Sequence, residues 1–244
     1  HSILNENVIA CATQKHLRAP QINAGEQTML PMGLLSSTCT PSRKTIRKGH
    51  QNFAHFFPSL KNGISIGCES HLETECCYLL EYDHEITRYH AQPHCFKWAD
   101  AGKDYCYTPD FLVHCADSSI YLLEVKLDFE HLEERYRDKL NSFSVLCRDQ
   151  GWEYRQWSRA QIRRHANLDT LKYLYSRSHH IDAADKFFFE KAARQIKWPV
   201  TLGQLINQLP QFSINLLCHQ LFYRALRADL RQTVTLDLLI EGLA

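Results

Sequence analysis

The spacing of hydrophobic residues between positions 46 and 157 switches between helical and strand periods. Apolar residues recur at helical spacing over 70–82, and Ser70 is a natural N-cap for that helix. Short strand patterns follow at 86–90 and 95–98, and two further strands at 110–115 and 120–126 are joined by an Asp-Ser-Ser turn. A second helical pattern covers 130–149, and a last strand pattern covers 153–157. The order predicts an α/β domain over 46–157, with a hairpin at its centre.

From residue 158 onward the pattern is mainly helical, with candidate helices at 160–166, 168–175 and 183–196. Thr201 then caps a short helix that begins at Leu202, and a turn follows near Pro210. Ser213 caps a longer helix over 214–226, and residues 233–238 alternate like a strand. Helix, turn, longer helix and strand is the order of a winged helix-turn-helix, so we expect a helical, winged-helix-like domain over 158–244.

The first 45 residues show little periodicity and contain three prolines and a Ser-Ser-Thr cluster. They predict an irregular N-terminal arm over 1–45 that leads into a basic stretch, with Arg43, Lys44, Arg47 and Lys48.

Glu124 and Lys126 lie two residues apart on a strongly β-prone segment, so their side chains point to the same face. Burial of both is costly unless something satisfies the two charges. If strands 110–115 and 120–126 pair as a hairpin, Asp110 comes near Glu124. Two adjacent carboxylates repel unless a cation lies between them, and Mg²⁺ prefers carboxylate oxygens, water and phosphate. The pattern therefore predicts a magnesium site beside Lys126. The lysine would position a water molecule for attack on a phosphate group.

Glu73 has two interpretations. Ser70-x-x-Glu73 is a capping box, in which the glutamate turns back to the Ser70 backbone N–H. Its place beside the apolar stripe of the helix also points it inward, toward the predicted site. The residues alone leave this choice open.

Composition narrows the class of protein. A content of 44% hydrophobic and 23% charged residues is typical of a globular chain, and no apolar run approaches the roughly 20 residues that span a bilayer. The ten cysteines include an adjacent pair and no C-x-x-C, which favours reduced, mostly buried thiols over a disulfide framework. Residues 61–150 hold nine Lys/Arg against seventeen Asp/Glu, whereas both flanking segments are basic. This charge pattern is typical of central metal binding with peripheral phosphate binding, although ordinary surface charge also produces it.

The motifs together resemble the TnsA family, the endonuclease subunits of heteromeric transposases. Those motifs are Ser70-x-x-Glu73, Gln92-Pro93, Thr108-Pro-Asp-Phe-Leu-Val113 and Leu123-Glu-Val-Lys126. The resemblance implies a restriction-endonuclease-like mixed sheet flanked by helices, of the PD-(D/E)xK superfamily. It also implies an active site of Glu73, Asp110, Glu124 and Lys126, with the three carboxylates as metal ligands. The first-described members carry glutamine at the position of Glu124, which leaves metal affinity open.

The resemblance further implies an Mg²⁺-dependent endodeoxyribonuclease, for which Mn²⁺ would substitute, that cuts the 5′ side of transposon ends. Its implied partners are transposon-end DNA, a DDE-type, TnsB-like transposase subunit, and an AAA+ ATPase regulator of the TnsC-like kind that binds the C-terminal domain. A bacterial cytoplasmic location follows. Gln92 is implied as active-site support, although a turn residue before Pro93 has the same appearance. Phosphate-contact candidates are the four basic arm residues above and Arg224, Arg227 and Arg231.

Two other functions stay open at the level of the sequence. One is a restriction- or repair-type nuclease that acts alone. The other is a non-catalytic DNA-binding assembly module, although the complete set of acids with Lys126 argues against it.

Overall fold

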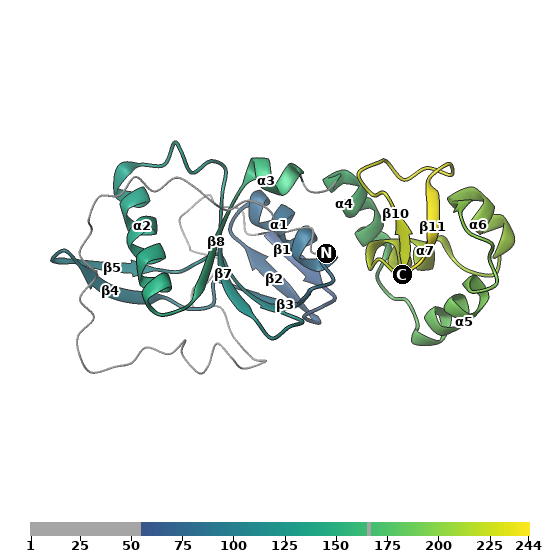
Figure 1. Cartoon of the computed structure of the whole chain (residues 1–244), viewed down its shortest axis with the longest axis horizontal. Coiled ribbons are helices and arrows are strands. Elements are labelled where there is room, and N and C mark those ends of the chain that lie inside the picture. Colours follow the sequence, from purple (N-terminus) through teal and green to yellow (C-terminus); the bar gives the residue numbers. More distant parts are fainter. Residues whose placement is uncertain (1–54, 165–166) are drawn as a thin grey trace. The chain divides into compact units, whose positions relative to one another are not determined.

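The computed structural model describes residues 55–164 and 167–244, so the predicted N-terminal arm lies outside the described residues (Figure 1). The chain divides into two compact units. Of the described residues, the first unit holds 55–74 together with Glu85–Ala160, and the second holds Glu75–His84 together with 161–164 and 167–244.

The first unit is built on a four-stranded mixed sheet. Its strands are β3 (Ile86–Ala91), β6 (Phe111–Cys115), β7 (Ile120–Lys126) and β8 (Glu153–Ser158), in the order β3-β6-β7-β8. The first three are antiparallel neighbours, and β8 runs parallel to β7. Parallel neighbours need a long crossover, and α2 (Glu134–Asp149) provides it. With α1 (His71–Tyr82) before the sheet, the fold is mixed α/β with flanking helices, as predicted.

The core of this unit lies between the sheet and α2. Strand β7 is buried on both faces, because Leu122 and Leu123 are each at most 1% exposed. Leu122 faces α2 and packs with Leu112 of β6 and with Phe143 and Leu140 of the helix. The near-continuous apolar run of β7 is typical of a central strand covered on both sides.

Two hairpins extend the sheet region: β1 (His55–Ser59) with β2 (Ile64–Cys68), and β4 (Phe96–Asp100) with β5 (Lys103–Tyr107). The pattern at 95–98 predicted β4 only in part and missed β5, because β5 is largely exposed and polar. Ala101 and Gly102 both have positive φ angles, as a two-residue hairpin turn requires. Trp98 Nε1 donates to Ser142 Oγ at 2.9 Å, and that hydroxyl donates to Asp100 Oδ2 at 2.6 Å, so the hairpin is bonded to α2.

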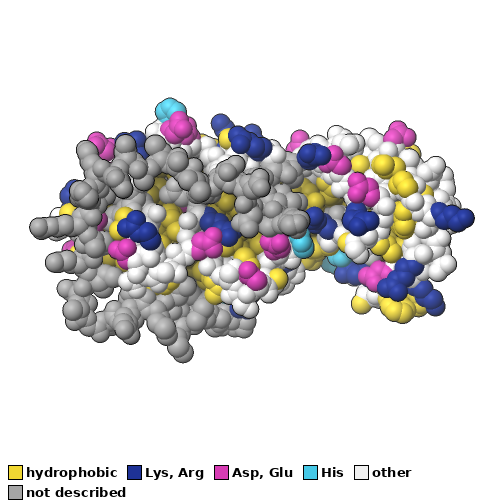
Figure 2. All heavy atoms as spheres, in the orientation of Figure 1, with side chains coloured by type: hydrophobic (Ala, Val, Ile, Leu, Met, Phe, Trp, Pro, Cys, Tyr) yellow, Lys and Arg dark blue, Asp and Glu magenta, His cyan; other side chains and the backbone are white. Residues whose placement is uncertain are grey.

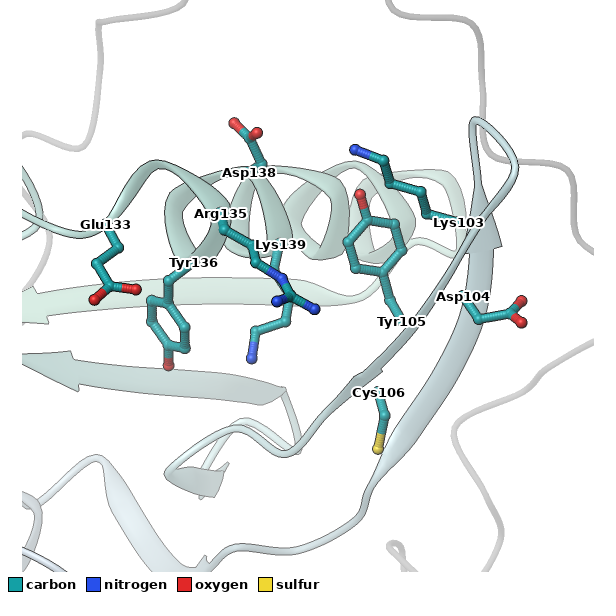
Figure 3. A pocket seen from close by; sticks show the side chains of 9 residues that line it. All are labelled: Lys103, Asp104, Tyr105, Cys106, Glu133, Arg135, Tyr136, Asp138 and Lys139. Carbon is teal, nitrogen blue, oxygen red and sulfur yellow. The ribbon is translucent and has the colours of Figure 1, made fainter.

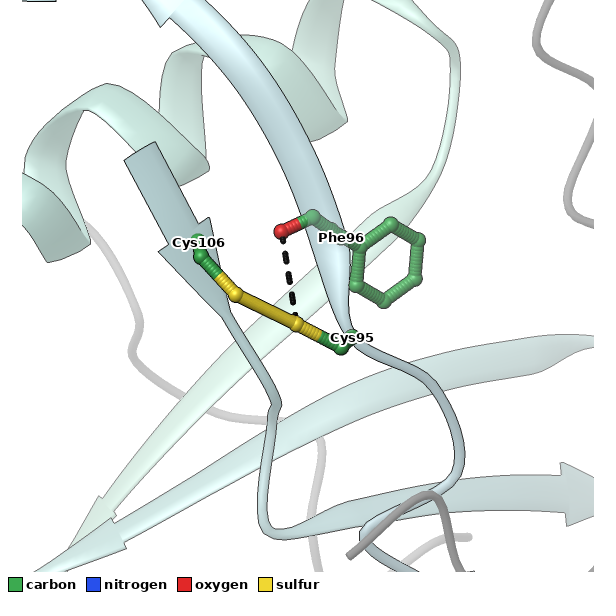
Figure 4. Close-up of a disulfide and its surroundings, with 3 residues drawn as sticks. All are labelled: Cys95, Phe96 and Cys106. Carbon is green, nitrogen blue, oxygen red and sulfur yellow. Dashed lines mark hydrogen bonds between the residues drawn. A yellow bond between two sulfur atoms is a disulfide. The ribbon is translucent and has the colours of Figure 1, made fainter. Parts of the chain in front are cut away.

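Cys95 and Cys106 form a disulfide across the start of this hairpin (Figure 4). The expectation of thiols is therefore wrong for these two residues. Strand pairing places Lys97 opposite Cys106, which brings residue 95 close enough to bond, and sequence spacing does not reveal that register. Among the described residues the other six cysteines are thiols, five of them buried.

The second predicted helix of this unit begins later than expected. Residues 130–133 form a turn before α2, because Asp128 Oδ1 accepts the Glu130 backbone N–H at 2.7 Å. A side-chain bond of this kind competes with the helix and delays its start.

The second unit is mostly helical. Its helices are the greater part of α1, from Glu75 onward, α3 (Arg159–Arg164, which begins in the first unit), α4 (Leu168–Arg177), α5 (Ala183–Ala193), α6 (Leu202–Gln208) and α7 (Ile214–Phe222). Strands β9 (Val200–Thr201), β10 (Leu226–Ala228) and β11 (Leu239–Leu243) form a small sheet in the order β10-β11-β9. Thr201 caps α6 and Ser213 caps α7, as predicted.

Two boundaries in this unit differ from the prediction. Helix α7 ends at Phe222, not at 226, because Arg224 adopts φ 61°, which a right-handed helix does not allow. The strand predicted at 233–238 lies instead at 239–243. The alternation of buried residues starts at Leu238 and continues through Ile240, where β9 and β10 provide pairing partners.

Helix α7 is buried on nearly all sides. Every residue from Leu216 to Phe222 is buried, and the helix packs closely against α4 and β10. Only Ile214 and Asn215 at the start of α7 are exposed, which leaves little of this helix free to read a DNA major groove. Across the described residues, no helix has the length and apolarity needed to cross a bilayer.

Candidate active site

Asp110 and Glu124 lie at the same end of two paired strands. Phe111 of β6 is opposite Leu123 of β7, so the residue before Phe111 comes next to the residue after Leu123. Both side chains are buried, with 6% of Asp110 and 1% of Glu124 exposed. The Val125 backbone N–H donates to Asp110 Oδ2 at 2.8 Å and fixes the aspartate against β7. The hairpin expected from the sequence thus brings these carboxylates together.

The Lys126 ammonium group lies beside both carboxylates. Its Nζ is 2.6 Å from Glu124 Oε1 and 3.4 Å from Asp110 Oδ2, and it donates to the Val125 carbonyl oxygen at 3.1 Å. Burial favours the neutral amine, but the neighbouring Glu124 and Asp110 carboxylates prevail and raise the pKa of Lys126 above its usual value. The side chain remains a cation held by three oxygen atoms.

Negative charge exceeds positive charge in the cluster of Asp110, Glu124 and Lys126. Burial, followed by repulsion from Glu124, raises the pKa of Asp110 well above its usual value, although Lys126 acts in the opposite direction. Glu73 adds a smaller repulsion. One monovalent ammonium therefore does not balance the buried carboxylates, and an additional cation would stabilise their ionised forms.

Three tyrosines surround Glu124, and no pattern along the chain singles them out. Tyr136 of α2 donates to Glu124 Oε1 at 2.8 Å, and Tyr107 of β5 donates a short hydrogen bond to Oε2. The Tyr154 hydroxyl is 3.1 Å from the Tyr107 hydroxyl. Burial, then the charge of Glu124, raises the pKa of Tyr136, so the phenol remains a donor. These residues come from β5, α2 and β8, and only tertiary packing brings them to one carboxylate.

Glu73 forms the cap of α1. Ser70 Oγ accepts the Glu73 backbone N–H at 3.1 Å, and the Glu73 carboxylate accepts the Ser70 hydroxyl at 2.9 Å and the Glu69 backbone N–H at 2.8 Å. The capping interpretation thus holds, with the Glu69 N–H in place of the expected Ser70 N–H. Burial raises the pKa of Glu73, and its charge also interacts with Lys126. Glu73 is therefore a capping residue within electrostatic range of the cluster.

Gln92 supports the cluster through its backbone. Its N–H donates to the Asp110 carbonyl oxygen at 2.8 Å, and its side chain is buried. It adopts φ 47°, a left-handed conformation that is costly for a residue with a side chain. This turn directs the chain from β3 past Asp110.

The basic residues proposed as phosphate contacts are in different situations. Arg43, Lys44, Arg47 and Lys48 lie outside the described residues. Arg224 donates to His84 Nδ1 at 2.9 Å, and Arg231 forms a two-point bond to Asp229. Arg227 is exposed on β10. Only Arg227 of the three described arginines shows no internal charge or hydrogen-bond partner among the contacts found in the described residues.

The carboxylates do not form a ready-made metal cage. Within the described ranges, no group of three or more His, Cys, Asp or Glu side chains is arranged to hold a metal ion. Lys126 lies against Asp110 and Glu124, and Glu73 is engaged by Glu69 and Ser70. The chemistry of the donors nevertheless suits a hard cation, because three oxygens already surround the Lys126 ammonium and the cluster is short of positive charge.

Residues 83–158 match the family model described as TnsA-like endonuclease N terminal. The match contains Asp110, Glu124 and Lys126, together with β3, β6, β7, α2 and β8, and begins after Glu73. No curated protein matches the chain. The match at residues 83–158 and the mixed sheet support a TnsA-family endonuclease, a nuclease of the transposase-subunit type.

Proposed function

We propose that the chain is the Mg²⁺-dependent endonuclease subunit of a heteromeric transposase, and that it cuts the 5′ side of each transposon end. The observation that carries the proposal is the buried cluster of Asp110, Glu124 and Lys126, which lies inside the matched endonuclease domain. A buried cluster with unbalanced negative charge is costly to fold, which favours a functional role over a structural one.

Asp110 and Glu124 would hold the metal ion, with Glu73 as a third carboxylate once its capping bonds are released. Bound there, Mg²⁺ or Mn²⁺ would supply positive charge to the scissile phosphate and acidify water. Glu124 is already oriented by Tyr107 and Tyr136, so its carboxylate needs little reorganisation.

Lys126 would act on the phosphodiester itself. Its pKa is raised, so it carries a proton and a positive charge at neutral pH. Once displaced from between the carboxylates it would orient the attacking water and offset charge on the phosphate. Gln92 would support this arrangement indirectly, through its backbone bond to Asp110.

The second unit would bind protein partners more than DNA. We propose a winged-helix-like unit that binds the AAA+ ATPase regulator, while the transposase subunit joins the 3′ ends. Helix α7 is covered and two of its neighbouring arginines are internally bonded, which disfavours groove reading. On α5, Phe187 and Phe188 are 63% and 59% exposed, and hydrophobic and Lys/Arg side chains lie together on that surface (Figure 2).

Alanine variants of the cluster test the catalytic assignment. Asp110→Ala and Lys126→Ala should each abolish 5′ cleavage of transposon-end DNA in the assembled complex while leaving co-purification with the transposase subunits intact. Asp117→Ala, an exposed aspartate in the β6–β7 turn, is the matched control and should cut normally. Cleavage by Asp110→Ala at the wild-type rate would place the active site elsewhere.

The same assay distinguishes the stand-alone nuclease. Cutting of arbitrary duplex DNA by the isolated wild-type chain, with Mg²⁺ and no partner, would favour a restriction- or repair-type enzyme. We expect cleavage only in the presence of the partner subunits.

A further inference from the structure

A pocket of about 590 Å³ lies between β5 and the first two turns of α2. Its walls are Lys103, Asp104, Tyr105 and Cys106 from the strand side, and Glu133, Arg135, Tyr136, Asp138 and Lys139 from the helix side (Figure 3).

The pocket adjoins the candidate active site through one side chain. Tyr136 lines the pocket with its ring, and its hydroxyl donates to Glu124 Oε1 at 2.8 Å. The Lys139 ammonium lies 4.4 Å from the centre of that ring and 5.5 Å from the ring of Tyr107, the second donor to Glu124. A molecule in the pocket would therefore lie next to the groups that orient the proposed catalytic carboxylate.

The positively and negatively charged side chains that line the pocket point in different directions. Three cations and three carboxylates line the pocket, but Figure 3 shows the Arg135 and Lys139 side chains directed into the space between α2 and the strands. Asp104 and Asp138 point away from that space, outward from β5 and from the far side of α2 (Figure 3). The interior is thus more positive than the composition of its lining suggests, which suits an anion.

The flat side chains suit a nucleotide. The Tyr105 ring projects between β5 and α2, and its plane is stacked on Trp98 with ring centres 5.2 Å apart. Tyr105 and Tyr136 are partly exposed, and lysine and arginine beside accessible aromatic rings are the combination that binds the backbone and bases of a nucleic acid strand.

The walls are held at a fixed spacing. Ser142 of α2 accepts from Trp98 and donates to Asp100, both on β4, while Phe143 packs on Tyr107 with ring centres 4.5 Å apart. The pocket is therefore formed in advance of binding.

We propose that this pocket holds the DNA strand next to the scissile phosphate, with Arg135, Lys103 and Lys139 on its phosphates and Tyr105 against a sugar or base. The inference rests on the proposed function, because it places the strand that the Glu124 cluster cuts.

The test measures binding apart from cleavage. The full chain binds a short fluorescein-labelled DNA duplex in Ca²⁺ instead of Mg²⁺, and fluorescence anisotropy gives Kd over a series of KCl concentrations. Arg135→Ala and Lys103→Ala should each weaken binding by roughly 3- to 10-fold and reduce the slope of log Kd against log salt by about 1. Arg135→Lys should keep the slope. Arg148→Ala, a substitution of an exposed arginine at the other end of α2, is the matched control and should bind like the wild type.

Wild-type affinity and slope for both Arg135→Ala and Lys103→Ala would overturn the pocket assignment. A loss of affinity for Arg148→Ala equal to that for Arg135→Ala would also overturn it, since the effect would then be one of overall charge. The catalytic proposal fails separately, by normal cleavage of Asp110→Ala. In that variant the binding that depends on Arg135 and Lys103 should persist, because Asp110 is not among the residues that line the pocket.

Discussion

At the scale of single residues, Glu124 is the most tightly held group of the candidate site. Its Oε1 accepts a hydrogen bond from the Tyr136 hydroxyl and forms an ion pair with the Lys126 ammonium. Its Oε2 accepts a hydrogen bond from the Tyr107 hydroxyl. Burying a carboxylate that is only 1% exposed costs free energy, and here two phenol donors and a cation compensate for the lost water. A metal ion at this site must therefore compete with Lys126 for one of these oxygens.

Asp110→Asn should stabilise the metal-free protein at neutral pH. The pKa of Asp110 is raised on folding, so its contribution to stability is full below its unfolded pKa and is lost as pH rises through the folded pKa. Asparagine removes the free-energy cost of ionising a buried carboxyl group, and its side-chain oxygen can still accept the Val125 N–H. We expect a gain of roughly 1–2 kcal/mol, or a rise in melting temperature of about 2–8 °C, measured by thermal unfolding in EDTA at pH 7.

The gain in stability of Asp110→Asn should shrink toward pH 4, where Asp110 of the folded wild type is protonated. Added Mg²⁺ should stabilise the wild type and leave Asp110→Asn nearly unchanged. A variant that melts below the wild type at pH 7 would show that the Asp110–Lys126 contact outweighs the repulsion.

Tyr107→Phe and Tyr136→Phe should each reduce cleavage by only a few fold, about 1 kcal/mol, because the remaining phenol still orients Glu124. The double variant should lose more than the product of the two single losses, since no phenol then holds the carboxylate. Single-turnover rates at saturating Mg²⁺, with Mg²⁺ titrations of each variant, measure this. Tyr173→Phe, a change at an exposed tyrosine of the second unit, is the control. Strictly multiplicative losses would argue that each phenol acts alone.

At the scale of elements, the β4–β5 hairpin is fixed by α2 rather than by the main sheet. The two strands form a separate sheet, yet Phe96, Trp98 and Tyr107 belong to the same buried cluster as Phe143. The hairpin thereby places Tyr107 beside Glu124 and forms the wall of the pocket that faces α2.

Ser142→Ala should loosen this attachment. The Trp98 indole N–H would lose its acceptor in a buried position, which costs roughly 1–2 kcal/mol, a fall of about 2–8 °C in melting temperature. DNA binding at the pocket should weaken in parallel, because the walls are no longer held together. Ser144→Ala, at an exposed position of the same helix, should change neither quantity. An unchanged melting temperature for Ser142→Ala would mean that aromatic packing alone fixes the hairpin.

At the scale of the whole molecule, the acidic residues between 61 and 150 divide into an exposed group and a buried group. Much of the acidic charge between 61 and 150 is exposed on turns and on α2, whereas three acids, Glu73, Asp110 and Glu124, are buried in the candidate site. The second unit instead exposes an apolar pair on α5, which is where we expect a protein partner.

Phe187→Ser combined with Phe188→Ser should reduce co-purification of the ATPase regulator by at least about 10-fold, since two exposed aromatic anchors are lost. Folding should be unaffected, because both side chains already face solvent. Ile64→Ser, which removes an equally exposed apolar side chain from the first unit, is the control. Undiminished recovery of the regulator with the double variant would place its binding surface elsewhere.

Local pattern was enough for much of the first unit and of its site. The helix over 71–82 with its Ser70 cap, the 111–126 hairpin and the side-by-side Glu124 and Lys126 all depend on residues close in sequence. Periodicity of 3.6 or 2 residues is written directly into such segments, so the sequence determined them by itself.

Only the tertiary structure decided what depends on neighbours that are remote in sequence. Strand 239–243 exists where β9 and β10 offer pairing partners, and the disulfide exists because β4 pairs with β5. Tyr107, Tyr136 and Tyr154 come from three different elements to surround Glu124, and α7 is covered by packing. Cross-strand register and helix packing are set by contacts between distant segments, and no short-range period records them.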